Sequence, residues 1–319
     1  MTDPVDPAPS PEVVAVGGAT LDRFYDVTNL PEPDGGAYAR DVTERFGGVG
    51  ANVAAGFAVL DRETALLARL GDGDIGDRVL ADLEAGPIET ELIQRGPGTT
   101  THCIIARGPD GERMIVTAGN STVQLELPDA ARDAVRDAGA LFVSAYAPDN
   151  VAAELVEIAA EPDGPALVFD LSGPVEELHD RGTEPPTIDR AVEVADLFVT
   201  GEVAAESYLD CPAEEAVDAL REGGCSRGAV TFGPEGATLF AGDERTEVPA
   251  FDVDTADTTG AGDTFTAALA ERWLLGDADA ERAGPFAAAA AALNCRAEGA
   301  RGGLPDREMV EAFLAEGER

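Results

Sequence analysis

The chain has 319 residues, of which 62 are Asp or Glu and 22 are basic, and its formal net charge is −40. All the basic residues are Arg, so a catalytic Lys and a P-loop, whose phosphate cradle needs a Lys, are excluded. Such a charge repels nucleic acids and anionic membranes, and no run of about 18 apolar residues could span a bilayer. We therefore expect neither nucleic acid nor membrane as a partner.

The acidic residues are interleaved with apolar ones at helix and strand periods, which argues against disorder. The charge fits a very salty cytoplasm, where the Debye length falls to about 3 Å and carboxylates cease to repel one another at range. The four cysteines are scattered and form no CxxC pair, which indicates neither a disulfide framework nor a zinc site. We expect a reduced, cytoplasmic, halophilic protein.

In chain order, residues 1–11 are acidic and Pro-rich and predict a disordered arm, followed by one domain over 12–319. Residues 13–17 predict a buried strand, 50–60 a helix, 64–70 a strand and 75–86 a helix. From about residue 129 helices alternate with strands, and a group of helices follows Gly260. Strands that alternate with helices predict an α/β fold, a doubly wound Rossmann-like sandwich. The segments 20–46 and 90–118 have hairpin character instead and predict a small β-sheet lid.

The sharpest motif is the segment 257–265, DTTGAGDTF, in which a Gly-rich turn runs into a helix. Such a turn leaves backbone N–H groups free at the positive end of a helix dipole, where they can hold a transferring phosphoryl group. Asp263 stands at the helix start. It either caps the helix or accepts the proton of an attacking hydroxyl, and the spacing alone leaves both interpretations open.

Two further segments carry glycines or a carboxylate near an element boundary. Residues 47–54, GGVGANVA, open a helix, but their spacing differs from G-x-G-x-x-G and they do not follow a strand, which disfavours a dinucleotide site. Asp22 follows the first strand, at the edge of an open α/β sheet where ligands bind. It accepts hydrogen bonds from two sugar hydroxyls, or it is a turn residue.

Together these segments resemble the ribokinase-like (PfkB) family of carbohydrate kinases, from about residue 13 to the C-terminus. GGVGANVA is similar to the first family signature and DTTGAGDTF to the second, while AVTFGPEGA over 229–237 and AALNCRAEGA over 291–300 resemble its nucleotide side. The resemblance implies a Rossmann-like sandwich with a small β lid. It also implies ATP-dependent phosphorylation of a hydroxyl of a sugar, sugar acid or sugar phosphate, with ATP and Mg²⁺ as cofactors.

The resemblance assigns roles to individual positions. It implies that Asp263 is the catalytic base and that an anion hole is formed by Gly260, Ala261 and Gly262. The implied sugar-binding residues are Asp22, Gly47, Gly48 and Asn52. The implied nucleotide-binding residues are Thr231, Gly233, Gly236 and, at the adenine end, Asn294.

The family's N-x-x-E motif, which helps to organise Mg²⁺, is absent from the matching segment 198–206. Gly201 stands in the place of the Asn and Ala204 in that of the Glu. Glu202 and Glu206 are out of register, and Asp170 and Asp257 are other candidates, so the sequence assigns no metal ligand. A non-catalytic sugar- or nucleotide-binding member is therefore one alternative function. A nucleoside kinase similar to adenosine kinases is another.

Two residues of the predicted lid are further substrate-binding candidates. Arg23 follows Asp22, and an anionic substrate of so acidic a chain would need Arg to offset its charge. His102 lies in a predicted lid strand and contacts the substrate if it points inward. Lid-to-lid dimers are common in the family that the chain resembles, which implies a homodimer through the lid.

Overall fold

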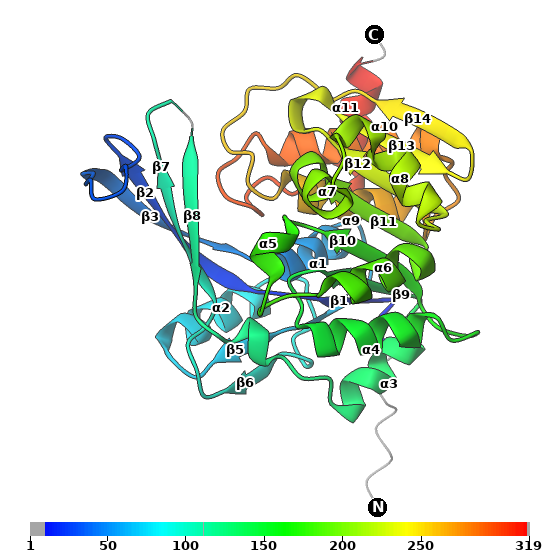
Figure 1. Ribbon diagram of the computed structural model, residues 1–319, viewed down its shortest axis with the longest axis horizontal. Coiled ribbons are helices and arrows are strands. Elements are labelled where there is room, and N and C mark those ends of the chain that lie inside the picture. The colour runs from blue at the N-terminus through cyan, green and yellow to red at the C-terminus, as the bar shows by residue number, and fades with distance from the viewer. Residues whose placement is uncertain (1–9, 111, 318–319) are drawn as a thin grey trace, which may run out of the picture.

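The computed structural model describes residues 10–110 and 112–317, so most of the predicted N-terminal arm, residues 1–9, lies outside the described residues. The main sheet has eight strands in the order β14-β13-β12-β11-β10-β9-β1-β4 (Figure 1). In chain order these are β1 (Val13–Val16), β4 (Thr64–Leu67), β9 (Ala140–Ser144), β10 (Ala166–Leu171), β11 (Leu197–Gly201), β12 (Arg227–Thr231), β13 (Ala237–Ala241) and β14 (Glu244–Val248). The neighbours from β4 to β12 are parallel, and β13 and β14 extend the sheet as an antiparallel edge.

Helices cover both faces of the main sheet. One face carries α1 (Val49–Val59), α9 (Ala261–Trp273), α10 (Ala280–Asn294) and α11 (Arg307–Gly317). The other carries α3 (Asp129–Asp137), α4 (Asp149–Ala159), α6 (Pro185–Val194), α7 (Glu202–Leu209) and α8 (Ala216–Glu222). Val13 and Ala15 pack into the first layer while Val14 and Val16 pack into the second, as strand alternation requires. The predicted doubly wound sandwich is confirmed.

The helix pair α1 and α9 is closely packed because small residues line its contact. A Cβ atom added at Gly56 of α1 would lie 2.7 Å from the Cβ of Ala267 in α9, so only glycine fits there without a shift. Gly56 and Ala267 each lie one helical turn beyond a predicted site residue, Asn52 and Asp263. The close approach of the two helices therefore sets how near those side chains lie to each other.

A buried carboxylate joins α9 to α11 and to the turn after α1 on the same face. Glu271 of α9 is 1% exposed. Its Oε1 accepts from Arg62, just after α1, at 3.1 Å and from Arg307 of α11 at 2.6 Å. A buried charge is tolerated only when it is paired, and the two guanidinium groups provide the pairing at Oε1, while Oε2 has no hydrogen-bond partner among the described residues.

A second, four-stranded sheet has the order β3-β2-β7-β8, and we call it the lid. Its strands are β2 (Thr20–Val27), β3 (Ala39–Gly47), β7 (His102–Arg107) and β8 (Arg113–Ala118). Figure 1 shows it projecting to one side of the main sheet. The prediction that residues 90–101 also belong to it is wrong for β6 (Gln94–Gly96). That strand pairs with β5 (Arg69–Gly71) in a separate sheet beside α2 (Asp74–Glu84), and the Gln94 N–H also donates to Ala68 O at 2.8 Å, which ties the segment to the chain just after β4.

The connection after β1 positions the site. The chain leaves β1 through the lid and α1 to reach β4 on one side, and later continues at β9 on the other side. A crevice opens at the carboxyl ends of parallel strands where the strand order reverses in this way, and ligands bind there. A ligand site is therefore expected where β1 and β9 end. No helix among residues 10–110 and 112–317 is long and apolar enough to cross a membrane.

Candidate active site

Asp22 lies at the base of the lid, just beyond β1. It is 9% exposed, and its Oδ1 accepts from the backbone N–H of Cys103 in β7 at 3.1 Å. A Cβ atom at Gly47 would lie 2.5 Å from Asp22 Oδ2, so the glycine leaves that oxygen accessible. Burial raises the pKa of Asp22, and the hydrogen bond from Cys103 opposes that rise. The carboxylate keeps acceptor capacity for a polar ligand.

The glycines before α1 let its N-terminus sit directly on the end of β1. Gly48 has φ +96°, and a Cβ atom there would lie 2.5 Å from the carbonyl oxygen of Gly18. At Gly50 a Cβ atom would lie 2.7 Å from the backbone of Gly17. The Ala51 N–H then donates to Gly18 O at 3.1 Å. This contact fixes the first turn of α1, which carries Asn52.

Asn52 and Asp263 face each other across α1 and α9. The Nδ2 of Asn52 donates to Oδ2 of Asp263 at 2.7 Å. Asn52 is 5% exposed, and its Oδ1 has no hydrogen-bond partner among the described residues. Burial raises the pKa of Asp263 to about 6, although the hydrogen bond from Asn52 favours the charged form. Asp263 makes no capping hydrogen bond to its own helix, which favours the base over the cap.

The turn before Asp263 presents free backbone donors. Gly260 is the N-cap of α9 with φ +77°, and a Cβ atom there would lie 2.4 Å from Ala300 O. The N–H of Ala261 donates to Thr258 O at 3.2 Å, while those of Gly262 and Asp263 have no partner among the described residues. Open space surrounds Gly262. An anion can therefore approach the N–H groups of Gly262 and Asp263.

Asp170, at the end of β10, is a second carboxyl group in the same crevice. It is 6% exposed, and burial together with the charge of Asp263 raises its pKa to about 8. Burial and mutual repulsion thus favour a proton on Asp170 over one on Asp263. Environments that separate the pKa values of two carboxyl groups are typical of sites that move protons.

A cavity of about 260 Å³ opens next to this crevice, at the ends of β10, β11 and β12. Thr231, Gly201, Glu202 and Ala204 line it, together with Gly233 at φ +57°. The residues with a predicted nucleotide role at 231 and 233 thus lie beside the segment that lacks N-x-x-E. Gly236 has a different task, because a Cβ atom there would lie 2.1 Å from Val248 O. It permits the turn between β12 and β13.

Asn294 and Asp257 hold the loop that follows α10. Asn294 is 1% exposed, its Nδ2 donates to Ala300 O at 2.9 Å and its Oδ1 accepts from Gly303 N–H at 3.2 Å. Asp257 accepts from Thr259 and from the N–H of Gly299. Both amide atoms of Asn294 are thus used within the loop, which does not favour its predicted contact with adenine.

Arg23 does not join the site. Successive residues of a strand point to opposite faces, and Arg23 lies on the face opposite to Asp22. Its Nε donates to Glu44 at 2.8 Å, and Glu44 also accepts from Arg78 of α2. These contacts do not favour the predicted substrate contact of Arg23. His102 precedes Cys103 in β7, and its Nδ1 donates to Thr100 O at 2.9 Å.

Tyr146, Arg181 and Thr122 lie at the crevice although the sequence did not single them out. Tyr146 comes two residues after β9, so its place at the end of a central strand was a usable signal. Arg181 lies in the Pro-rich segment 173–187, whose apolar residues follow neither the helix nor the strand period, so the sequence held no signal for it. Thr122 is 8% exposed, and its Oγ1 has no hydrogen-bond partner among the described residues.

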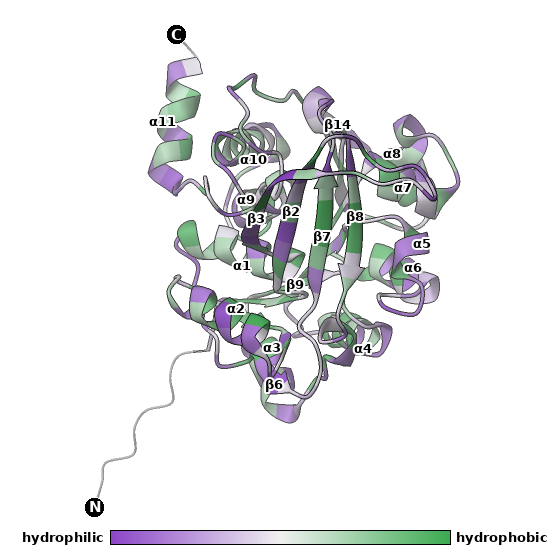
Figure 2. Cartoon of the chain, turned by 90° about the vertical axis from the view of Figure 1, so that its left-hand side faces the viewer, coloured by the Kyte–Doolittle hydropathy of each residue, from purple (hydrophilic) through white to green (hydrophobic). Residues whose placement is uncertain are grey.

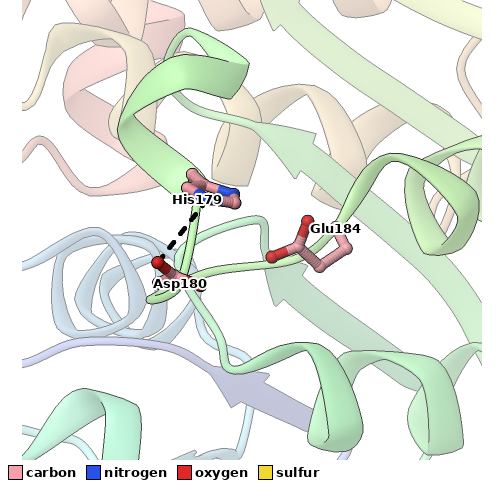
Figure 3. A group of neighbouring side chains, drawn as sticks. All are labelled: His179, Asp180 and Glu184. Atoms are coloured by element: carbon pink, nitrogen blue, oxygen red, sulfur yellow. Dashed lines mark ion pairs between the residues drawn. The ribbon is translucent and has the colours of Figure 1, made fainter.

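His179, Asp180 and Glu184 form a separate group on the loop between α5 (Val175–Leu178) and α6 (Figure 3). Their ligand atoms lie within 4.8 Å of one another. His179 and Asp180 have side chains that are 74% and 88% exposed. Exposed clusters of this kind are common without an ion, so we assign no metal here.

Comparison with known proteins agrees with this geometry. The pfkB family carbohydrate kinase profile matches residues 10–307. The chain belongs to this family. As a pfkB carbohydrate kinase, it phosphorylates a hydroxyl group of a sugar or sugar derivative with ATP, and the activity predicted from the two signatures is confirmed at this level.

Individual relatives span nearly the whole of this pfkB kinase. The ATP-dependent ribose-1-phosphate kinase of Halopiger xanaduensis is 32% identical over 316 residues, which are 95% of this chain and 98% of that protein. The ribokinase of Bacillus subtilis is 28% identical and covers 95% of this chain and 99% of its own. The structure of Arabidopsis thaliana ribokinase complexed with ribose and ATP has a TM-score of 0.82 at 26% identity, over 96% of this chain and 99% of that one. The ribokinase-like fold is thereby confirmed.

Proposed function

We propose that the chain transfers the γ-phosphoryl group of ATP to a hydroxyl of a pentose or a pentose derivative. The observation that supports this is the hydrogen bond between Asn52 and Asp263, which joins a buried carboxylate of raised pKa to the helix that follows the Gly47–Gly48 turn. The relatives named for ribose and ribose 1-phosphate support a pentose.

The site residues divide the work of binding and proton transfer. Asp22 accepts from sugar hydroxyls, and Asn52 Oδ1 is a further acceptor at the same place. Asp263 accepts the proton of the attacking hydroxyl as its oxygen bonds to phosphorus, and its pKa of about 6 suits a base that works near neutral pH. The N–H groups of Gly262 and Asp263 hold the oxygens of the transferring group. Gly260 shapes this turn, and Gly47 and Gly48 shape the sugar side.

The cavity beside Gly201 fits the nucleotide side of the reaction. Its lining of Thr231, Gly233 and Gly201 brings backbone close to an anion without bulky side chains. Glu202 is the carboxylate that lines it and would supply an oxygen ligand to Mg²⁺, directly or through water. Magnesium, when bound, neutralises charge on the phosphate oxygens.

The outer face of the lid supports the homodimer. Val42, Ile104, Met114 and Val116 are between 40% and 56% exposed, and strand pairing places them on the face opposite to Asp22. Figure 2 looks onto the lid, where green segments run along β7 and β8. An exposed apolar face of this kind is typical of protein interfaces. A second copy of the chain offers the same face in an isologous contact.

The proposed setting of this activity is a reducing cytoplasm of high salt concentration. The four cysteines are free, as expected for a protein of a reducing cytoplasm. The charge of −40 fits a cytoplasm rich in salt.

The test is ADP release in molar KCl with ribose, ribose 1-phosphate and adenosine. We expect turnover with at least one pentose, and Asp263→Asn should lower kcat by about 10²–10⁴-fold with ATP binding largely kept. Asp180→Asn, at an exposed position, is the matched control. Turnover with adenosine alone would favour the nucleoside kinase, and binding without ADP release the non-catalytic member. Near-normal turnover of Asp263→Asn would remove Asp263 from the mechanism.

A further inference from the structure

Arg181 lies in a loop that is fastened across the end of β9. The N–H of Thr183 donates to Ala145 O at 2.8 Å, and the Oγ1 of Thr183 donates to Ala147 O at 3.2 Å. The loop therefore lies at the end of β9, beside the crevice between β1 and β9. The sequence could not place it there, because nothing in the segment 173–187 predicts its partner.

The guanidinium group of Arg181 lies over the ring of Tyr146, with Cζ 5.4 Å from the ring centroid. The Tyr146 hydroxyl donates to Oε2 of Glu177 at 3.0 Å. The same Oε2 lies 3.7 Å from Arg181, while Nε of Arg181 donates to the carbonyl oxygen of Glu177. The side chain is thus oriented by a ring and a carbonyl, and its only carboxylate contact among the described residues is a long one to a half-exposed group.

The charge of Arg181 also affects two titratable groups of the crevice, the Cys103 thiol and the Tyr146 hydroxyl. Burial and the charge of Asp22 raise the pKa of the Cys103 thiol to about 12, and Arg181 acts in the opposite sense. Burial raises the pKa of Tyr146, on which both Arg181 and Asp170 act. Tyr146 therefore lies within the electrostatic reach of both Asp170 and Arg181, and Arg181 is close enough to the sugar side to act on the Cys103 thiol.

Three arginines of the lid are more tightly paired than Arg181. Arg23 is bound to Glu44 on the outer face, Arg45 to Glu298, and Arg107 to both oxygens of Asp26 at 2.8 and 3.4 Å. A phosphate monoester carries a charge of about −1.5 to −2 and needs local compensation in a chain of such acidity. Only Arg, His and backbone N–H groups can provide it here, and the guanidinium fork matches phosphate oxygens.

We propose that Arg181, held over Tyr146, receives a phosphate group that the sugar carries at the end remote from its acceptor hydroxyl, and that the substrate is a pentose 1-phosphate. The proposal rests on the proposed function, because it needs the acceptor hydroxyl at Asp263. The phosphate replaces the long contact with Glu177, whose carboxylate retains the Tyr146 hydroxyl. Arg181 is thus a specificity-determining residue of the sugar side.

The experiment compares kcat/KM for ribose 1-phosphate and for ribose in the wild type and in Arg181→Gln, at one high salt concentration. A charge-assisted contact corresponds to about 10- to 150-fold in affinity. We expect kcat/KM for ribose 1-phosphate to fall by that factor in Arg181→Gln and that for ribose to change by less than about threefold. Arg23→Gln, on the opposite face of the lid from Asp22, is the matched control and should leave the ratio of the two substrates unchanged.

The outcomes separate this proposal from the proposed function. The proposed role of Arg181 is overturned if the wild type phosphorylates ribose and not ribose 1-phosphate, or if Arg181→Gln lowers kcat/KM equally for both sugars. The proposed pentose kinase activity stands in either case. If the wild type phosphorylates neither, both proposals fall. Should Arg181→Gln melt at a lower temperature than the wild type, Arg181→Lys takes its place. It keeps the charge without the fork and should impose a smaller penalty, confined to the phosphorylated sugar.

Discussion

The side-chain amide of Asn52 donates to the carboxylate of Asp263 at 2.7 Å, although 211 positions separate the two residues in the chain. The bond favours the ionised form of a carboxyl group whose burial favours the protonated form. Asn52 thus affects both where Asp263 lies and the pH at which it can act.

The first prediction concerns the pH dependence of the reaction. Asp263 must be ionised to accept a proton, so kcat/KM should rise with pH through about 6 and level off above it. Asn52→Ala removes the hydrogen bond that lowers the pKa of Asp263, so the rise should move to higher pH as kcat/KM falls. The measurement is kcat/KM from roughly pH 5 to 9. Asn29→Ala, at an exposed turn of the lid, is the control. If kcat/KM of Asn52→Ala rose at the same pH as that of the wild type, Asn52 would not influence the pKa of Asp263.

The second prediction concerns Asp170 and stability. Burial raises the pKa of Asp170 from its ordinary value of 3.8 to about 8 in the folded protein. Between these two pH values the carboxyl group is therefore protonated in the folded chain and ionised in the unfolded chain. The free energy of unfolding therefore falls as pH rises from about 4 to about 8. Asp170→Asn mimics the protonated group, so it should raise this free energy by about 1 kcal/mol or more above pH 8 and keep most of the activity.

Thermal unfolding of Asp170→Asn and the wild type across that pH range is the measurement. Asp180→Asn replaces an exposed carboxylate and should show no such trend. If Asp170→Asn were instead less stable than the wild type at high pH, the prediction would be wrong. The folded state would then need the negative charge of Asp170, for example to hold a cation.

The third prediction separates two glycines of one turn. Gly260→Ala forces a side chain into φ +77° against Ala300 O, so we expect a loss of about 1–3 kcal/mol in stability. Gly262→Ala meets open space, so its melting temperature should stay near that of the wild type. Its new methyl group instead occupies the approach to the free N–H groups, and kcat should fall by about 10²-fold. Equal melting temperatures for both variants would refute this division.

The fourth prediction concerns salt. With a charge of −40, self-repulsion should be strong at 0.1 M KCl, where the Debye length is about 10 Å, and weak at molar salt, where it is about 3 Å. We expect the melting temperature to rise steeply between these conditions. Sucrose at low salt, which strengthens burial without screening charge, is a control for a general solvent effect. A melting temperature that is unchanged from 0.1 M to ~3 M KCl would contradict the prediction.

The alternation of elements predicted the fold, and the two Gly-rich segments predicted the turns that open α1 and α9, because both patterns are local. Gly48 and Gly260 adopt positive φ where the chain enters a helix, and such a turn is visible as glycines before an apolar period. Asp263 follows that turn directly. The order of strands and helices along the chain likewise predicts a mostly parallel sheet covered by helices.

Residues whose role depends on pairing across the fold could not be predicted in this way. The register of β2 against β3 decides that Arg23 meets Glu44 and not the crevice, and a sequence does not fix which face of a strand is turned inward. Arg181 reaches Tyr146 because its loop is bound to β9, a contact between segments without a motif. Asn294 was placed near adenine by the resemblance, whereas its amide is used by the neighbouring loop.

The ionic contact at Glu271 behaves differently from the acidic exterior. Ions and water reach a surface carboxylate freely, but they have little access to Glu271, which is 1% exposed. The hold of Arg62 and Arg307 on α9 should therefore be nearly the same in dilute buffer as in brine. When the protein is diluted from brine, its C-terminal helix should be among the last parts to detach, and the lid, with no comparable anchor described, among the first.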